Sequence, residues 1–491
     1  MAEASQESIK RLIENSEKGL SQIEISLPLV LEARKAAIEA IRNKEGDDVV
    51  LDLLLVVLDT LLSENEVIYD LSSSLDTLLK AKDDYAKRFY MQSLNLCFWE
   101  SCMLFVGASD DDKYGLLSRL EPLTKQLNQA GCQFITRHII DDIQTFRSAY
   151  ADRELRNITR HYDDPIKMYE KLISLDNIDF FAKGASQLMA IRMEVSVVSS
   201  FLLALLAPAK NEERQVITKK KKCNINEIFN NAIFKALKER NLKKELQDIL
   251  AKGQATLDDC YRLHKLCVKA TDFLKERNYD IPEGFHKMES IILLRMEVLY
   301  MRYDIACSVW GYLNAASDKE RSQNLRLIHI TKQAALTHFY GYNDNNRKRS
   351  LWSRIKAMEE AGSKELKTDG VEKSLMELVS NLSKDNENSR MYAHYRYGQE
   401  FYIPARLHAF GKMVHYKELT DAVKLLNVCK TLEGYTLRLL SCIDKKQKQE
   451  TKQKHDEWMG MIEDLAAKMG NDDQTQKVLE PFKSLVDKVY G

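Results

Sequence analysis

The stretch DDVVLDLLLVVLDTLLSENEVIYDLSSSLDTLL, residues 47–79, predicts one long helix. The two aspartates that open it are suited to cap its N-terminus, because an Asp side chain accepts hydrogen bonds from the first backbone N–H groups. Its apolar run Val49–Leu62 is interrupted by Asp52 and Asp59 and is shorter than the roughly 20 apolar residues that span a bilayer. The run Val195–Ala207 is also too short. We therefore expect two core helices and no membrane partner.

Helical periodicity continues on both sides of this stretch. Only 7 prolines and 18 glycines punctuate 491 residues, whereas all-β and doubly wound folds need many turns. Hydrophobic residues make up 44% and charged residues 30%, a globular balance that excludes global disorder. The predicted fold class is all-α. The length exceeds one ordinary core, so at least two domains are expected.

Charge and cysteine content narrow the classes of function. Lys plus Arg and Asp plus Glu balance at 73 each, so the chain lacks the broad basic field of a protein that coats nucleic acid. Any contact with RNA must come from a local cleft. Nine scattered cysteines without a Cys-x-x-Cys pair indicate buried thiols in a reducing compartment. The polar, acidic N-terminus is unlike a secretory signal, so we predict a cytoplasmic protein.

The two halves of the chain resemble each other at an offset of 234 residues. Tyr69-Asp70 falls on Tyr303-Asp304, and Arg156 falls on Arg390. The same landmarks follow one another in each half. An apolar helix ends in an aromatic or apolar residue and Gly, and an Asp/Asn-rich turn and then a basic helix come after it. An Arg/His motif follows, and a long apolar helix comes last. Chance similarity between two helical bundles is the alternative explanation.

This order predicts two tandem helical bundles related by internal duplication. The first covers 1–207 and the second, a degenerate copy, covers 227–445. A basic linker over 208–226, with four consecutive lysines, joins them, and a helical tail over 446–491 follows. A linker explains the lysines better than a nucleic-acid patch does.

One short motif carries the functional prediction: Arg156-Asn157-Ile-Thr-Arg-His161, followed by Tyr-Asp and then Asp164-Pro165. On a helix, Asn157 and His161 share a face, whereas Arg156 converges with His161 only where the helix bends or ends. Asp164-Pro165 has the form of an N-cap followed by Pro at the first position of a new helix. We therefore expect His161 at a helix terminus, half exposed, with Asn157 fixing its ring.

These three side chains suit the cleavage of RNA. Histidine exchanges a proton near neutral pH, with either the attacking 2′-hydroxyl or the leaving oxygen. Arginine holds a phosphate and stabilises its developing charge. No metal or cofactor is required, and none of the ten histidines has a partner at metal-ligand spacing.

The motif resembles the signature of the HEPN domains, which are helical bundles of prokaryotic toxins, phage-defence proteins and CRISPR effectors. That signature is Arg, four to six residues, then His, commonly with Asn directly after the Arg. The resemblance covers residues 50–207 as a bundle, and its specific part is the six residues of the motif. It implies a metal-independent ribonuclease with Arg156, Asn157 and His161 as catalytic residues, completed where two domains bring their motifs together.

The second half departs from this pattern. Its counterpart, Arg390-Met-Tyr-Ala-His394, has three residues between Arg and His, and Met where Asn is expected. The shortened spacing predicts that Arg390 and His394 bind the substrate phosphate while His161 carries the proton. Aromatic residues over 392–402 are suited to stack on bases, but a role in the bundle core is the favoured interpretation.

The sequence leaves two functions open. One is a HEPN-like endoribonuclease, or its inactive relative, in a prokaryotic defence or toxin–antitoxin system. The other is a non-catalytic helical scaffold for protein partners, because Arg, Asn and His also serve as ordinary capping residues at helix ends. The candidate partners are RNA, an antitoxin or other defence protein, and a second copy of the chain.

Overall fold

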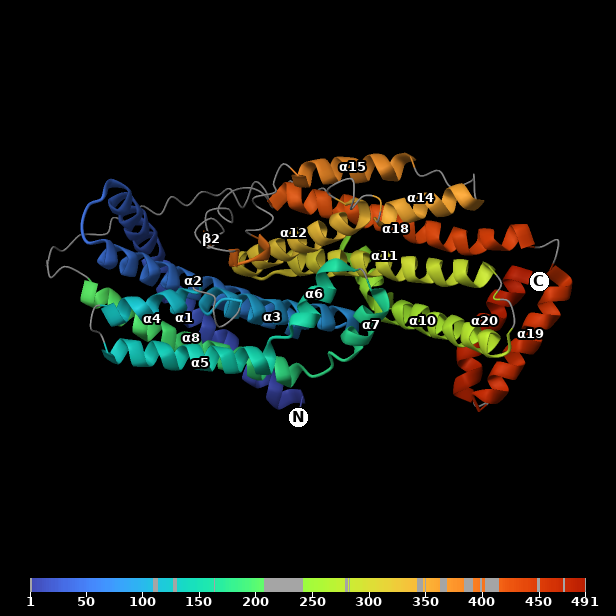
Figure 1. Cartoon of the computed structure of the whole chain (residues 1–491), viewed down its shortest axis with the longest axis horizontal. Coiled ribbons are helices and arrows are strands. Elements are labelled where there is room, and N and C mark those ends of the chain that lie inside the picture. The colour runs from blue at the N-terminus through green and yellow to red at the C-terminus, as the bar shows by residue number, and fades with distance from the viewer. Residues whose placement is uncertain are drawn as a thin grey trace.

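The computed structural model is an elongated bundle of long helices (Figure 1). It describes residues 2–108, 114–126, 130–162, 164–206, 242–278, 281, 283–341, 348, 350–362, 369–383, 392–397, 400–401, 415–447, 451–470 and 473–490. Within these ranges every regular element is an α-helix except a hairpin of two short strands, β1 (Arg396–Tyr397) and β2 (Glu400–Phe401). The predicted all-α class is confirmed. The predicted linker, 208–226, lies outside the described residues.

The first half is built around α2, which runs from Asp48 to Lys80 and is buried on most of its surface. Asp47 caps it as predicted, accepting from the backbone N–H groups of Val49 at 2.9 Å and Val50 at 3.2 Å. Helices α1, α3, α4 and α8 pack around it. The elements of this half are α1 (Ala2–Asn43), α3 (Asp84–Phe105), α4 (Leu116–Gln126), α5 (Ala130–Tyr150), α6 (Arg153–His161), α7 (Pro165–Ile173) and α8 (Ile178–Leu206).

In the second half, α11 (Glu283–Asn314) takes the central position, with α10, α12 and α18 against it. The remaining helices are α10 (Leu242–Glu276), α12 (Asp318–Tyr340), α14 (Leu351–Gly362), α15 (Asp369–Ser383) and α18 (His415–Gln447). Helices α2, α3 and α8 thus have counterparts in α11, α12 and α18, which pack on one another in the same way. An internal duplication would produce this recurrence, and the duplication itself stays a prediction.

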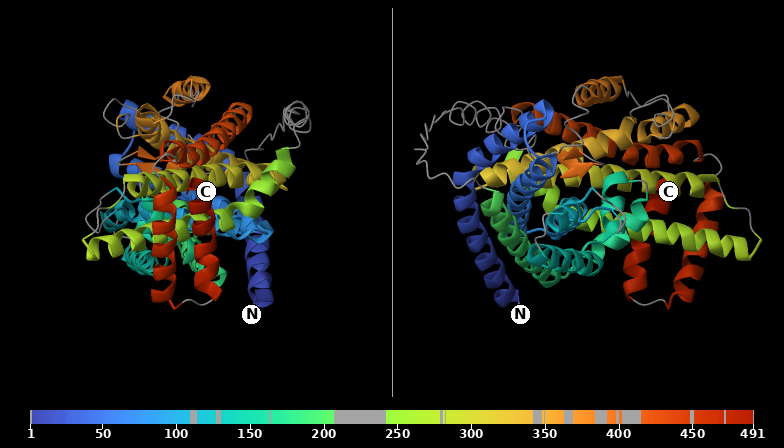
Figure 2. Two further views of the ribbon diagram at one scale, coloured as in Figure 1. Left: turned by 90° about the vertical axis from the view of Figure 1, so that its right-hand side faces the viewer. Right: turned by 60° about the vertical axis from the view of Figure 1, so that its left-hand side comes forward.

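A single continuous core joins the two halves, because its buried apolar residues come from α2, α3 and α8 as well as from α11, α12 and α18. The halves meet where α12 packs on α2 and where α10 and α11 pack on α3. The predicted C-terminal helical tail comprises α19 (Thr451–Lys468) and α20 (Asp473–Tyr490), which stand across one end of the molecule (Figures 1 and 2). Trp458 stacks on Phe285 at 4.3 Å and docks the tail on α11.

Helix α8 differs most from its expected form. It begins at Ile178, well before the apolar run Val195–Ala207, and is the one helix among the described residues long and apolar enough to span a membrane by length and composition. Only 39% of its most apolar window is buried inside the protein. The expectation that it is a core helix therefore holds for one of its faces, and its other face lies at the surface.

Candidate functional site at the contact of the two halves

Helix α6 presents the motif as a short helix that ends at His161, as predicted. Its first turn is capped by Asp152, whose side chain accepts from the backbone N–H of Leu155 at 3.0 Å. The next residue after the helix, Tyr162, has a φ of +52°. This left-handed conformation costs a non-glycine residue about 1 kcal/mol, and it ends the helix abruptly. The new helix predicted at Pro165 is present as α7, capped by Asp164.

The side chain of Glu100 joins Arg156 of the first motif to His394 of the second. Arg156 Nη2 donates to Glu100 Oε1 at 3.2 Å, and His394 Nδ1 lies 3.2 Å and 3.1 Å from the two carboxylate oxygens. Glu100 is 1% exposed, whereas Arg156 and His394 retain 22% and 18% of their side-chain surface. A guanidinium and an imidazole 238 positions apart in the sequence therefore converge on one buried carboxylate and reach the surface beside it.

Asn157 bonds Arg156, and its predicted contact with the His161 ring stays a prediction because that side chain lies outside the described part of the structure. Asn157 Oδ1 accepts from Arg156 Nη1 at 3.1 Å, so it fixes the guanidinium. His161 is the last residue of α6, but its side chain lies outside the described part of the structure, as does the whole of Arg390. The structure thus brings together three of the five predicted site residues and does not test the placement of the other two side chains.

The contact with Glu100 gives His394 the arrangement of a general base. An ionised carboxylate only accepts hydrogen bonds, so the imidazole donates from Nδ1 to Glu100. Nε2 then carries the lone pair that takes a proton, and the carboxylate stabilises the imidazolium that forms. Arg156 is held by Glu100 and Asn157, and a guanidinium is a group that binds anions such as phosphate.

Two tyrosines hold the motifs of the two halves across the molecule. Tyr162, directly after His161, donates from its hydroxyl to Asp304 of α11 at 2.8 Å. Tyr395, directly after His394, donates to Asp70 of α2. Asp70 and Asp304 are the pair that the sequence offset aligned. Each motif is therefore anchored to the central helix of the opposite half, and we call these two bonds the crossed anchors.

The two anchoring aspartates have different electrostatic surroundings. Asp70 is paired with the guanidinium of Arg326, which is 1% exposed and donates through Nε to the carbonyl oxygen of Tyr392 at 2.7 Å. Asp304 instead accepts from two neutral hydroxyls, those of Tyr85 at 2.6 Å and Tyr162. Burial raises the pKa of Asp304 to about 7, and the two hydrogen bonds only partly offset this effect.

Asp304 should therefore make the stability of the fold depend on pH. Its pKa is raised on folding, so the folded protein binds the proton more tightly than the unfolded chain. The resulting stabilisation is complete below about pH 4 and is lost as the pH rises through about 7. Each pKa unit corresponds to about 1.4 kcal/mol, so the total effect is on the order of a few kcal/mol.

We expect the Asp304→Asn variant to flatten this dependence, because an amide does not ionise. Thermal unfolding of both proteins, followed at pH 5 and pH 8, checks this. Burial also raises the pKa of Glu64, to about 8. Glu64 is present in both proteins, so its contribution to the pH dependence of stability cancels in the comparison. Equal pH dependence in the two proteins would contradict the assignment.

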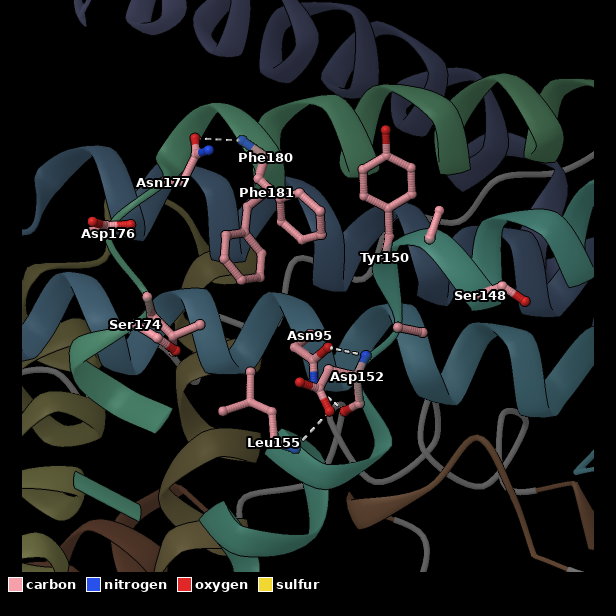
Figure 3. A pocket seen from close by; sticks show the side chains of 13 residues that line it. Asn95, Ser148, Tyr150, Asp152, Leu155, Ser174, Asp176, Asn177, Phe180 and Phe181 are labelled. Carbon is pink, nitrogen blue, oxygen red and sulfur yellow. Dashed lines mark hydrogen bonds between the residues drawn. The ribbon is translucent and has the colours of Figure 1, made fainter. Parts of the chain in front are cut away.

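A pocket of about 600 Å³ opens at the N-terminal end of α6 (Figure 3). Its wall contains the rings of Tyr150, Phe180 and Phe181, with 5.0 Å between the centroids of Tyr150 and Phe180. Its floor is fixed by Asn95, which exchanges two hydrogen bonds with the backbone of Asp152 at 2.8 and 2.9 Å. Rings beside polar groups are suited to hold a planar, hydrogen-bonding ligand such as a nucleobase.

Sequence reasoning missed Glu100. It lies in the run Leu94–Phe105, whose apolar character is typical of a core helix. A lone carboxylate beside Phe and Trp in such a run is a usable signal, because a buried charge requires a partner. In the described ranges, no cluster of three or more His, Cys, Asp or Glu side chains could hold a metal ion. No protein-family model, curated protein or solved structure matches the chain.

Proposed function

We propose that the chain is a HEPN-like, metal-independent endoribonuclease whose active site is assembled from both halves. The observation that carries this proposal is the shared contact of Arg156 and His394 with Glu100. The motif of the first half supplies the phosphate-binding group, and the motif of the second half supplies a proton acceptor. The arrangement changes the role that the spacing suggested for His394, from phosphate binding to proton transfer.

In the proposed reaction, the 2′-hydroxyl of a ribose attacks the adjacent phosphorus. His394 Nε2 takes the hydroxyl proton, and Glu100 stabilises the imidazolium. Arg156 neutralises the charge that develops on the phosphate oxygens. The bond from phosphorus to the 5′-oxygen breaks, and that oxygen takes a proton from a second acid, for which His161 is the candidate. The products are a 2′,3′-cyclic phosphate and a 5′-hydroxyl.

The surroundings of this site favour single-stranded RNA. Asn95, which bonds the backbone of Asp152 at the pocket, and Glu100 both lie on α3, about 7.5 Å apart along the helix axis and about 140° apart around it. A base of a bound RNA chain would stack on Phe180 in that pocket. Bases are accessible to such a pocket only when they are unpaired. Balanced net charge agrees with local recognition of this kind.

The proposal extends to the origin and setting of the chain. The crossed anchors join equivalent positions of the two halves reciprocally, which supports a duplicated ancestor. A composite site inside one chain would replace a site between two separate domains. A role in prokaryotic defence or as a toxin, with an antitoxin as protein partner, follows from the family resemblance alone.

The second candidate function is a non-catalytic scaffold. It is favoured by the similarity between Glu100 and other buried carboxylates of this fold. Glu297 also holds a histidine and an arginine, because it lies 2.6 Å from His338 Nε2 and accepts from Arg354 at 3.0 Å. Outside the motifs such a cluster serves packing. A structural role for Glu100 would make Arg156 and His394 its counterions.

A cleavage assay with the full-length chain distinguishes the two functions. Single-stranded RNA should be cut in excess EDTA at the rate seen without it, and the fragments should end in 2′,3′-cyclic phosphate. RNA with a single 2′-deoxy substitution should resist cleavage at that position, because the attacking oxygen is missing. Absence of EDTA-resistant cleavage, with the chain alone and with candidate activating proteins, would favour the scaffold.

A further inference from the structure

The outer face of α8 exposes a row of apolar side chains. Met193, Val197, Phe201 and Leu205 recur every fourth residue, so they lie in one row along the helix. Their exposed fractions are 62%, 68%, 53% and 51%. Phe134, at 75%, and Ile135, at 44%, are exposed apolar side chains in the first turns of α5, which packs against α8. We call these six residues the α8 face.

The two helices bring the six side chains to the same end of the molecule. Tyr150 at the end of α5 contacts Phe180 at the start of α8, so the two packed helices run in opposite directions. The first turns of α5 therefore lie beside the last turns of α8, at the lower left of Figure 1. Six large side chains exposed to this degree present on the order of 500 Å², as much as the largest apolar patch of a typical monomer.

We infer that the α8 face is the contact surface of a homodimer. The row is self-complementary about a two-fold axis through Val197. In that antiparallel pairing, Met193 of one copy faces Phe201 of the other, and the small residue Ala190 faces Ala204 of the other copy. An isologous interface requires such reciprocity. Two faces together bury on the order of 1,000 Å², which reaches the lower limit of specific interfaces.

The charges around the row favour a second copy over a lipid surface. Helices that lie on membranes carry several Lys or Arg residues beside their apolar side. The exposed positions of α8 from Ala190 onward include one charged residue, Glu194, and no basic one, and the basic residue next to Phe134 and Ile135 on α5, Arg137, is paired with Asp141 at 3.4 Å. The buried face of α8, including Leu188 and Val198, belongs to the core, so the helix does not leave the fold to cross a bilayer without exposing that core.

Light scattering of the purified full-length chain tests the inference. At micromolar concentration we expect twice the chain mass of 56.7 kDa. Val197→Glu should raise the dissociation constant by roughly a hundredfold or more, since it places two like charges at the axis. The matched control is Leu437→Glu on α18, a residue 50% exposed at the surface of the other half, which should remain dimeric.

Cross-linking gives a second readout that does not depend on affinity. The described native cysteines are all buried, so Val197→Cys adds one accessible thiol. Mild oxidation should convert this variant, and not Leu437→Cys, into a covalent dimer. A monomeric wild type, or a dimer unaffected by Val197→Glu, would overturn the inference. So would binding of the wild-type monomer, but not the Val197→Glu variant, to phosphatidylserine-containing vesicles.

Discussion

Replacement of His394 by alanine should slow RNA cleavage by roughly a thousandfold, because a positioned general base contributes between about a hundredfold and ten-thousandfold. The side chain is partly exposed and its main hydrogen-bond partner is Glu100, so the folded structure should persist. Initial rates at saturating RNA measure the effect. Added imidazole should restore part of the activity of His394→Ala, which a purely structural role would not allow.

His338 provides the matched control for this experiment. It also bonds a buried glutamate that binds an arginine, but it lies outside both motifs. His338→Ala should keep near wild-type cleavage at a temperature where it is folded. Glu100→Gln should lower kcat by roughly ten- to a hundredfold with little change in KM, as expected for a positioning residue. Equal losses in the two histidine variants would assign His394 a structural role.

The second large effect concerns stability and falls on Asp70. Asp70→Asn should lower the free energy of unfolding by about 3–5 kcal/mol, because it leaves the guanidinium of Arg326 buried without its counterion. The substitution preserves side-chain volume and an acceptor for Tyr395, so loss of charge is the main change. Unfolding in denaturant, monitored by circular dichroism, measures this effect. The dependence of the unfolding free energy on denaturant concentration is compared between the variants.

Two further variants identify the cause of this loss. Arg326→Met in the Asp70→Asn background should recover part of the stability, because replacing both charges is far less costly than removing one. Asp304→Asn at pH 7 should be milder than Asp70→Asn, since the partners of Asp304 in the described part of the chain are neutral hydroxyls. A similar loss in both aspartate variants, with no recovery by Arg326→Met, would contradict the ion-pair explanation.

Local signals in the sequence predicted the framework of the site well. Asp47 and Asp164 cap their helices because capping depends on residues only two or three positions away. The end of α6 at His161 follows from the same kind of signal. The all-α class follows from periodicity and from the scarcity of glycine and proline.

The contacts that complete the site could not be predicted from such signals. His394 meets Glu100 across 294 positions, and nothing in the spacing of either motif identifies that carboxylate. The bond from Arg156 to Asn157 could not be predicted either, because it depends on where Glu100 draws the guanidinium. Partner choice of this kind is decided by packing between distant segments.

The crossed anchors have a consequence for how the chain folds. They close contacts across 142 and 325 positions, so folding depends on long-range contacts even though each bundle is locally helical. When the first half leaves the ribosome, Asp70 meets neither Arg326 nor Tyr395, and Tyr162 lacks Asp304. Burying these groups unpaired is unfavourable, so the first half completes its core only after the second is synthesised. Two similar bundles thus mature as one cooperative unit.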